Sequence, residues 1–293
     1  MLPKLNGSGV GLKSWMKISA AVLITAMICV PVTATVMGSS SYMLNVAGST
    51  TVQPLMMELQ KEFEKFAKVE MNVTGGGSGV GVSSTLNGVA NIGMLSRDLT
   101  PEEKKKGLVV HPIALDAVVV VINTGAGLTV PDLTMEELLG IYNGTILNWN
   151  ELGGADKSIK VIAREQGSGS RECFDNAMKK EAERHGIEYR LRDGVLPIIS
   201  TNMVLTTVNN TDGAIGYVNY NVAHGHGDRT MTVSLNGIEA DDADIKDGTY
   251  PISRTLILVT KDEPTEMIKF FIDWILSEDG QRIVEESGFV RWK

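Results

Sequence analysis

The segment Arg164–Arg171, with the sequence REQGSGSR, contains the residue types that bind a small anion. It follows the apolar run 159–163 and precedes a stretch of helical spacing that ends at Gly186, so the pattern predicts a strand-to-helix turn. Free backbone N–H groups and the positive end of the helix dipole make such a turn a site for anions. Its glycines allow close approach to a ligand, its serines add hydroxyl donors and its arginines add charge.

Two further turns of the same kind occur earlier in the chain. GSTT at 48–51 follows the predicted strand 42–47, and GGGSGVG at 75–81 follows the predicted strand 69–73. A single glycine turn after a strand is ordinarily structural. Three such turns, each with hydroxyls at a helix start, favour a shared oxyanion, which can accept hydrogen bonds from many neutral donors.

The motifs of nucleotide-binding and acyl-transfer enzymes do not occur at these turns. Arg171 stands where a Walker lysine is required, and Ser78 lacks the second glycine of a GxSxG turn. No histidine lies within the three turns to act as a base. The histidines of segment 224–228 could be drawn as a metal site, but a glycine-rich stretch without further ligands is typical of a surface loop. We therefore expect no catalytic residue, no metal and no cofactor.

Length and charge narrow the class of protein. The 293 residues, 43% of them hydrophobic, suffice for one large or two modest domains. After residue 42 the chain carries 24 basic and 35 acidic residues, a net charge of −11. This acidic balance, without a basic stripe, argues against a nucleic-acid partner. The single cysteine of this part, Cys173, can form no internal disulfide, and we expect it to be a small core residue.

Residues 1–42 are predicted to be a signal peptide or an N-terminal membrane anchor. Lysines precede an apolar run from Ile18 to Met37, and Pro31 is followed by small residues typical of a cleavage site. A run of about twenty residues could also span a membrane uncleaved. Both alternatives predict that the body of the protein is extracytoplasmic: secreted, periplasmic or tethered to the outer face of the cell membrane.

Predicted strands and helices alternate along the body, which favours an α/β fold with mostly parallel sheets. The strongest strand signal is the apolar run 109–123, and the polar region 221–250 is expected to be a surface loop with short strands. A helix over 55–68 is expected to bury a face that includes Phe63 and Phe66. Ligands of open α/β sheets bind at the carboxyl ends of strands, where all three turns are predicted to lie.

Eight motifs, in order, resemble the phosphate-binding proteins of ABC-type phosphate importers, a family of the periplasmic-binding-protein superfamily. The motifs are GSTTVQP (48–54), GGGSGVG (75–81), IGMLSRDL (92–99), DAVVVVIN (116–123), WNELGG (149–154), REQGSGSR (164–171), GAIGYV (213–218) and YPISR (250–254). The resemblance implies a type II fold of two lobes, which close over the ligand about two crossover strands. It implies a lobe one of residues 43–120 plus 222–293 and a lobe two of residues 121–221, with crossings near 119–123 and 216–220.

The resemblance also implies a phosphate site between the lobes. The matching residues are Thr50, Thr51, Ser78 and Ser96 of lobe one, and Arg164, Ser168, Gly169 and Ser170 of lobe two. Arg164 matches the arginine that pairs with the phosphate. Some members place an aspartate where Ser96 stands, and that aspartate accepts the proton of hydrogen phosphate and rejects sulfate. A serine can accept the proton but carries no charge to repel sulfate, so selectivity between the two anions stays open.

Three charged residues near the site have alternative interpretations. Asp98 could replace the family's aspartate from two residues away, or Arg97 and Asp98 could form an ion pair within their loop. Arg171 lies one turn into the predicted helix, where it either binds the anion or supports the residues that do.

The resemblance implies an extracytoplasmic solute-binding subunit without catalytic activity. It would capture inorganic phosphate and deliver it to the permease and ATPase subunits of an ABC importer, and we expect a monomer. One alternative is a binder or sensor ectodomain for another oxyanion such as sulfate. A second alternative, a secreted phosphatase that uses a glycine-loop serine, is disfavoured by the missing base.

Overall fold

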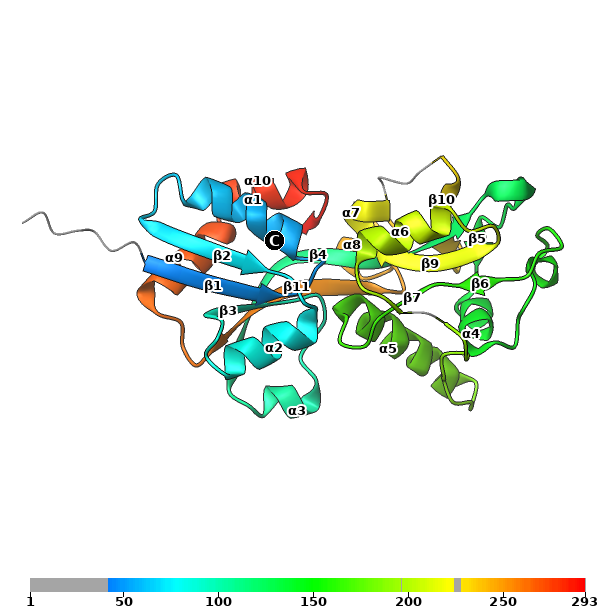
Figure 1. Cartoon of the computed structure of the whole chain (residues 1–293), viewed down its shortest axis with the longest axis horizontal. Coiled ribbons are helices and arrows are strands. Elements are labelled where there is room, and N and C mark those ends of the chain that lie inside the picture. Colours follow the sequence, from blue (N-terminus) through cyan, green and yellow to red (C-terminus); the bar gives the residue numbers. More distant parts are fainter. Residues whose placement is uncertain (1–41, 196, 224–227, 293) are drawn as a thin grey trace, which may run out of the picture. The chain divides into compact units, whose positions relative to one another are not determined.

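The computed structural model describes residues 42–195, 197–223 and 228–292 (Figure 1). The predicted leader, apart from Tyr42, lies outside these residues, and so do the histidines of the 224–228 pattern. Within the described ranges, no helix has both the length and the apolar character that a membrane span requires. The same ranges contain no group of three or more His, Cys, Asp or Glu side chains that could hold a metal ion.

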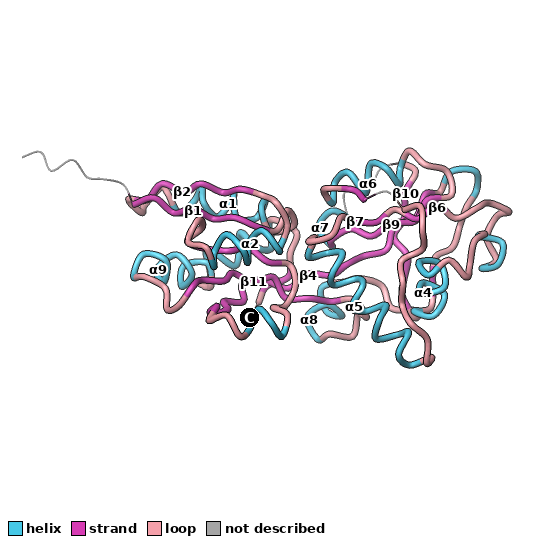
Figure 2. Tube along the Cα trace, turned by 60° about the horizontal axis from the view of Figure 1, so that its bottom comes forward, coloured by secondary structure: helices cyan, strands magenta, loops and turns pink. Residues whose placement is uncertain are grey.

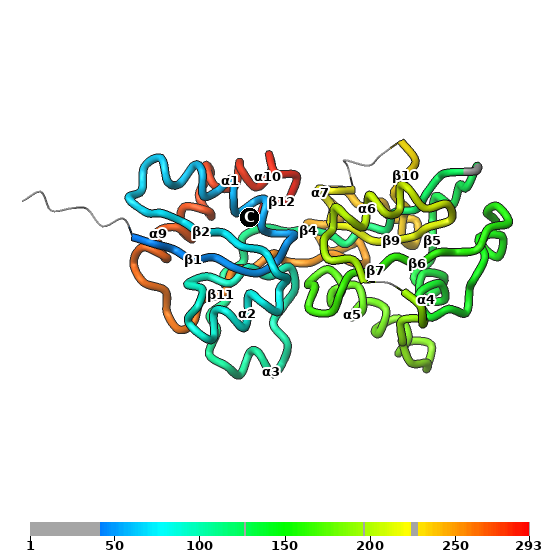
Figure 3. Tube along the Cα trace, viewed as in Figure 1, coloured from blue at the N-terminus to red at the C-terminus, as the bar shows by residue number. Residues whose placement is uncertain are grey.

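The first sheet combines strands from the two ends of the described body. Its strands are β2 (Val69–Thr74), β1 (Tyr42–Gly48), β3 (Ile92–Leu95), β11 (Ser253–Lys261), β4 (Leu108–Asn123) and β12 (Val290–Arg291). β1 is parallel to both β2 and β3, whereas β11 is antiparallel to β3 and to β4. In Figure 3, the blue strand β1 and the orange strand β11 belong to this sheet, and β3 lies between them.

Helices cover both faces of the first sheet. They are α1 (Gln53–Phe63), α9 (Glu266–Ile275) and α10 (Glu278–Glu286) on one face, and α2 (Ser78–Leu86) on the other, with α3 (Pro101–Lys104) following β3. The alternation of side chains along β11 separates the two layers. Leu256 and Leu258 pack with the residues of α1, α9 and α10, whereas Ile257 and Val259 pack with Val82 of α2.

The second sheet is built on the other half of β4. Its further strands are β9 (Ala214–Asn219), β6 (Lys160–Val161), β10 (Thr230–Leu235) and β5 (Asp132–Leu133), and a separate pair is formed by β7 (Ala163–Arg164) and β8 (Pro197–Ile198). β9 and β10 flank β4 and are antiparallel to it. The helices of this part are α4 (Met135–Asn143), α5 (Gly169–Arg184), α6 (Thr201–Asn209), α7 (Tyr220–Ala223) and α8 (Asp242–Asp247), with short 3₁₀ turns at Gly125–Gly127 and Trp149–Leu152.

β4 connects the two sheets. Its residues 108–117 pair with β11 in the first sheet, and its residues 118–122 pair with β9 in the second. The apolar run predicted at 109–123 is therefore one long strand that belongs to both sheets. Figure 2 shows β4 between the two groups of strands and helices.

Several local predictions differ from the structure. The sheets are mixed rather than mostly parallel, because β4 is antiparallel to β9, β10, β11 and β12. α1 ends at Phe63, five residues before the predicted end, so Phe66 is 56% exposed and the prediction that it is buried is wrong. The strand predicted at 159–163 is divided at Ile162, since β6 pairs with β9 and β7 pairs with β8.

The packing of β10 bears on the lobe boundaries. Residues 221–250 were expected to be a surface loop with short strands. β10 is a short strand of this region, but it pairs with β4 and its Val233 and Leu235 are buried. Tyr250 and Ile252 pack in the same core as β9 and α4. We therefore propose that residues 228–252 belong to lobe two, and that the second crossing is the start of β11 rather than residues 216–220.

Candidate functional site

The glycine-rich turns predicted from the sequence meet at one place. The Gly77 N–H donates to the Gly48 carbonyl oxygen at 2.9 Å, which joins the turn before α2 to the end of β1. The Gly79 N–H donates to the Gly167 carbonyl oxygen at 3.3 Å, which joins α2 to the turn before α5. The carboxyl ends of β1, β2 and β3 therefore face the N-terminus of α5, as expected for ligand sites in α/β proteins.

Gly169, the first residue of α5, lies against two serines of the facing lobe. A Cβ atom at this position would collide with Ser78 Oγ and with Ser96 Oγ. The backbone of α5 can approach these hydroxyls only because the residue is glycine. The sequence predicted that the glycines of this turn approach a ligand closely, and in the structure Gly169 approaches two serine hydroxyls in this way.

Buried hydroxyls from both lobes surround Gly169. The Ser96 N–H donates to Ser78 Oγ at 3.1 Å, and the Oγ atoms of Ser78 and Ser96 are 3.4 Å apart. Ser49 Oγ donates to Ser96 Oγ at 2.9 Å. Thr51 Oγ1 lies 3.2 Å from Ser170 Oγ, across the gap between lobes. All five side chains belong to residues that are at most 3% exposed, so these hydroxyls are shielded from bulk water.

Arg164 lies beside this cluster, with 1% of its surface exposed. Its Nη2 donates to Thr50 Oγ1 at 3.2 Å, and its Nη1 donates to Thr201 Oγ1 at 2.9 Å. Glu165 accepts from Nε and Nη2, both at 2.9 Å, which neutralises the guanidinium charge in part. The backbone N–H of Arg164 donates to Tyr217 Oη at 3.2 Å, which ties β7 to β9.

Ser168 and Arg171 shape the start of α5. Ser168 is the N-cap residue, and its Oγ accepts from the Arg171 N–H at 3.3 Å. The Arg171 guanidinium pairs with Asp175 at 2.7 Å and donates to the Arg164 carbonyl oxygen at 2.8 Å. Of the two interpretations of Arg171, this geometry favours the one in which it supports the backbone of Arg164.

In the loop after β3, Arg97 forms other ion pairs than the one expected with Asp98. Arg97 pairs with Glu103 at 2.7 Å and with Glu172 of the facing lobe, whereas it reaches Asp98 only at the backbone carbonyl. The Asp98 side chain is exposed, so it does not replace the aspartate that some family members have at the position of Ser96. The predicted pair between Arg97 and Asp98 is wrong.

Two buried charged residues lie within the motifs DAVVVVIN and YPISR, but the sequence alone suggested no role for them. Arg254, at the start of β11, pairs with Asp116 of β4 at 2.6 Å and also reaches the hydroxyl cluster. Burial raises the pKa of the Asp116 carboxyl, although the Arg254 guanidinium opposes this shift. The sequence contained a signal for both residues, because each charge adjoins a strongly apolar strand in which an unpaired charge would be costly.

Cys173 was expected to be a small core residue, and it lies at the edge of the core rather than within it. The residue is half-buried, packs against the core of lobe two and forms no disulfide within the described part of the chain. Burial raises the pKa of its thiol to about 11, so the group stays protonated near neutral pH.

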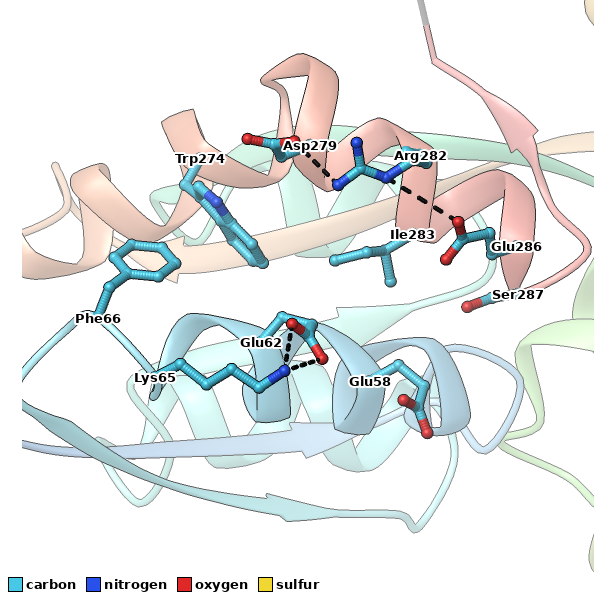
Figure 4. A pocket seen from close by; sticks show the side chains of 10 residues that line it. All are labelled: Glu58, Glu62, Lys65, Phe66, Trp274, Asp279, Arg282, Ile283, Glu286 and Ser287. Carbon is cyan, nitrogen blue, oxygen red and sulfur yellow. Dashed lines mark hydrogen bonds and ion pairs between the residues drawn. The ribbon is translucent and has the colours of Figure 1, made fainter.

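Two larger hollows lie outside the hydroxyl cluster. A groove of about 700 Å³ is lined by α3, α5 and the start of β11. A second hollow of about 680 Å³ lies between α1 and α10, and its charges form pairs: Lys65 with Glu62, and Arg282 with Asp279 and Glu286 (Figure 4). None of the predicted site residues lines either hollow.

Comparison with known proteins agrees with this geometry. Residues 31–279 match the PBP superfamily domain. The phosphate-binding protein PstS of Bacillus subtilis is 33% identical over 258 residues, which cover 84% of this chain and 80% of that protein. The chain belongs to the PstS family. PstS of Borreliella burgdorferi is 30% identical over 250 residues, with 84% and 89% coverage.

Solved structures of similar proteins share the fold of this PstS-family chain. A Clostridium perfringens protein, assigned as a phosphate ABC transporter substrate-binding protein and solved with bound phosphate, is 34% identical with a TM-score of 0.77. The match covers 86% of this chain and 100% of that one. An ABC-type phosphate transport receptor from Vibrio cholerae is 29% identical with a TM-score of 0.70, over 84% of this chain and 99% of the receptor. The expected two-lobed α/β fold is therefore confirmed.

Proposed function

We propose that this PstS-family protein captures inorganic phosphate between its two lobes. The observation that carries the proposal is the buried hydroxyl cluster, to which both lobes contribute, beside the buried guanidinium of Arg164. A phosphate ion has four oxygens and can accept many hydrogen bonds, so neutral hydroxyls and backbone N–H groups can replace its hydration shell. The proposed binding residues are Thr50, Thr51, Ser78, Ser96, Arg164, Ser168, Gly169 and Ser170.

The proposed binding cycle follows from the position of these residues on two lobes. Thr50, Thr51, Ser78 and Ser96 lie at strand ends of lobe one, and the others lie on β7 and α5 of lobe two. An anion that accepts hydrogen bonds from both sets stabilises the closed form relative to the open form. Arg164 supplies a formal positive charge at this site, while Glu165 and Thr201 fix its guanidinium in one orientation.

We also propose that the protein acts in transport and not in catalysis. It would be extracytoplasmic and would deliver phosphate to the permease and ATPase subunits of an ABC importer, without a cofactor or metal of its own. The hydrogen bonds of three serines, Ser78, Ser96 and Ser170, support this proposal. In the described part of the chain, these serines are hydrogen-bonded to hydroxyls, backbone groups and Arg254. These partners include no base that could activate a serine.

A second candidate is the same fold with another oxyanion, such as sulfate, as its ligand. Ser96 is buried among hydroxyls, and Asp98 is exposed, so no carboxylate of this loop faces the cluster. A site without such a carboxylate lacks the repulsion that would exclude a fully ionised anion.

Isothermal titration of the purified full-length chain with phosphate and then with sulfate tests both candidates. We expect saturable heat with phosphate, and a weaker or absent response to sulfate if phosphate is the physiological ligand. The absence of phosphate binding would overturn the proposed function, whereas tighter binding of sulfate would establish the second candidate. Hydrolysis of p-nitrophenyl phosphate would contradict the proposal that the chain is not an enzyme.

Arg164→Ala tests whether the heat arises at the proposed site. The substitution removes the guanidinium that lies beside the cluster, so we expect phosphate affinity to fall by at least about 100-fold, as for loss of a buried charge-assisted contact. Arg282→Ala is the matched control, because Arg282 is an exposed arginine of α10, beside the hollow between α1 and α10 (Figure 4). Equal affinity of the Arg164→Ala variant and the parent would place the anion elsewhere.

A further inference from the structure

Arg254 is a buried arginine that connects the crossing strands to the hydroxyl cluster. It lies at the start of β11, and its side chain is 3% exposed. Its Nε and Nη2 both donate to Asp116 Oδ2, at 2.9 and 2.6 Å. The other oxygen of Asp116 accepts from the Tyr220 N–H at 3.0 Å. Two strands and the start of α7 therefore hold the guanidinium in one place.

The remaining nitrogen of Arg254, Nη1, points into the site. It donates to Ser170 Oγ at 2.9 Å and to the Ser96 carbonyl oxygen at 3.2 Å. Ser170 belongs to α5 in lobe two, whereas Ser96 belongs to the loop after β3 in lobe one. The same guanidinium therefore contacts both halves of the predicted phosphate site.

The chemistry of these groups determines the direction of the hydrogen bonds. A guanidinium has donors only, so Ser170 Oγ must act as the acceptor from Arg254. The hydroxyl hydrogen of Ser170 can then point toward Thr51, 3.2 Å away, or toward an anion that contacts both hydroxyls. Arg254 thereby leaves the Ser170 hydroxyl available to donate a hydrogen bond to an anion, which only accepts hydrogen bonds.

We propose that Arg254, held by Asp116, is a positioning residue of the phosphate site that acts through Ser170. The proposal rests on the proposed function and names a further part of the same site. Arg254 orients the Ser170 hydroxyl as a donor and joins α5 to the Ser96 loop, so that both contribute to the anion in the closed form. Asp116 fixes the guanidinium and compensates its buried charge.

The test combines Arg254→Gln with Asp116→Asn, because Arg254→Gln by itself would leave a buried, unpaired carboxylate. Titration of the full-length double variant with phosphate is expected to give an affinity about 10- to 100-fold weaker than that of the parent, the usual effect of losing a hydrogen bond from a charged group. Circular dichroism and thermal unfolding report whether the variant is folded. Arg282→Gln on the exposed face of α10 is the control and is expected to bind like the parent.

A double-mutant cycle with Ser170→Ala distinguishes positioning from a general structural effect. If Arg254 acts through Ser170, the Arg254→Gln/Asp116→Asn pair should cost much less affinity in a Ser170→Ala background than in the parent. Arg254→Lys, which keeps a hydrogen-bond donor and the charge, should bind phosphate more tightly than the Arg254→Gln/Asp116→Asn variant and less tightly than the parent. Full additivity of the two changes, or parental affinity in the folded Arg254→Gln/Asp116→Asn variant, would overturn the proposal.

The outcomes also separate this inference from the proposed function. If the parent chain binds no phosphate, the proposed function fails and the inference fails with it. If the parent binds phosphate and the Arg254 variants bind it equally well, the proposed function stands and only the role of Arg254 is rejected. If the Arg254→Gln/Asp116→Asn variant does not fold, Arg254→Lys replaces it in the double-mutant cycle. Arg254→Lys should then cost less phosphate affinity in the Ser170→Ala background than in the parent, and an equal cost in both would overturn the proposal.

Discussion

The contact between Gly169 and the two serines of the facing lobe makes closure sensitive to a single methyl group. Ser78 Oγ and Ser96 Oγ both lie where a Cβ atom of residue 169 would be. The collision is between the lobes and not within one of them. A side chain at this position should therefore disturb the closed form much more than the fold of either lobe.

Gly169→Ala tests this argument at the residue scale. We expect phosphate affinity to fall by about 100-fold or more, because the closed form must relax to accommodate a Cβ between two buried hydroxyls. The unfolding temperature without phosphate should change little. Gly79→Ala is the matched control, since a Cβ there would have only ordinary contacts, the nearest at 3.7 Å from Gly167. Unaltered phosphate binding by Gly169→Ala would show that the lobes do not close as described.

At the scale of elements, α3 and α5 are joined by Arg97. The Arg97 guanidinium is fixed in lobe one by Glu103, which also completes a capping box at the start of α3. It pairs as well with Glu172 in the first turn of α5, in lobe two. This second pair forms between the lobes, at the groove behind the hydroxyl cluster. It should stabilise the closed form without contacting the anion.

Glu172→Gln should therefore accelerate phosphate release. Arg97 retains Glu103 in this variant, so the fold of lobe one is maintained. A partly exposed ion pair contributes about 1 kcal/mol, so its loss corresponds to a roughly fivefold increase in the dissociation rate constant, with little change in the association rate constant. Stopped-flow measurement of both rates checks the expectation, with Glu183→Gln on the exposed side of α5 as the control. An unchanged dissociation rate would mean that this pair does not stabilise the closed form.

The pair of Arg97 with Glu103 should also make stability depend on pH. Burial raises the pKa of Glu103, but hydrogen bonds from Arg97 and Thr100 and the Arg97 charge outweigh this effect, so the pKa is lower than that of an ordinary glutamate. A carboxyl whose pKa is lowered in the folded state contributes stability above its unfolded pKa, and this contribution is lost as pH falls. We expect Glu103→Gln to cost about 2 kcal/mol at pH 7 and progressively less below about pH 4.5. Urea unfolding of both proteins from pH 7 to pH 3.5 measures this difference, and a constant difference would contradict the assignment.

At the scale of the whole molecule, the sequence predicted the position of the site better than its surroundings. The turns at 48–51, 75–81 and 164–171 were found because strand-to-helix turns depend on local glycine and hydroxyl patterns. Short strands were expected in the region of β10, but its burial was not, because its alternation of Thr, Met, Val and Leu lies within a polar region and its pairing with β4 is a contact between distant segments. The pairing of Arg254 with Asp116 was not predicted for the same reason, since 138 residues separate the partners.

Phosphate should stabilise the protein as a whole, because its proposed contacts come from both lobes. A ligand that binds only the folded state adds about 2.7 kcal/mol at 100 times its dissociation constant. For a chain of this size, that corresponds to an increase of roughly 5–10 °C in unfolding temperature. Differential scanning calorimetry with and without phosphate measures the increase. Gly169→Ala serves as the comparison, because a protein that cannot close should gain much less. An equal increase in unfolding temperature in both proteins would show that one lobe binds the anion without closure. It would refute the site between two lobes, which the family resemblance implies and the facing hydroxyls of Thr51 and Ser170 support.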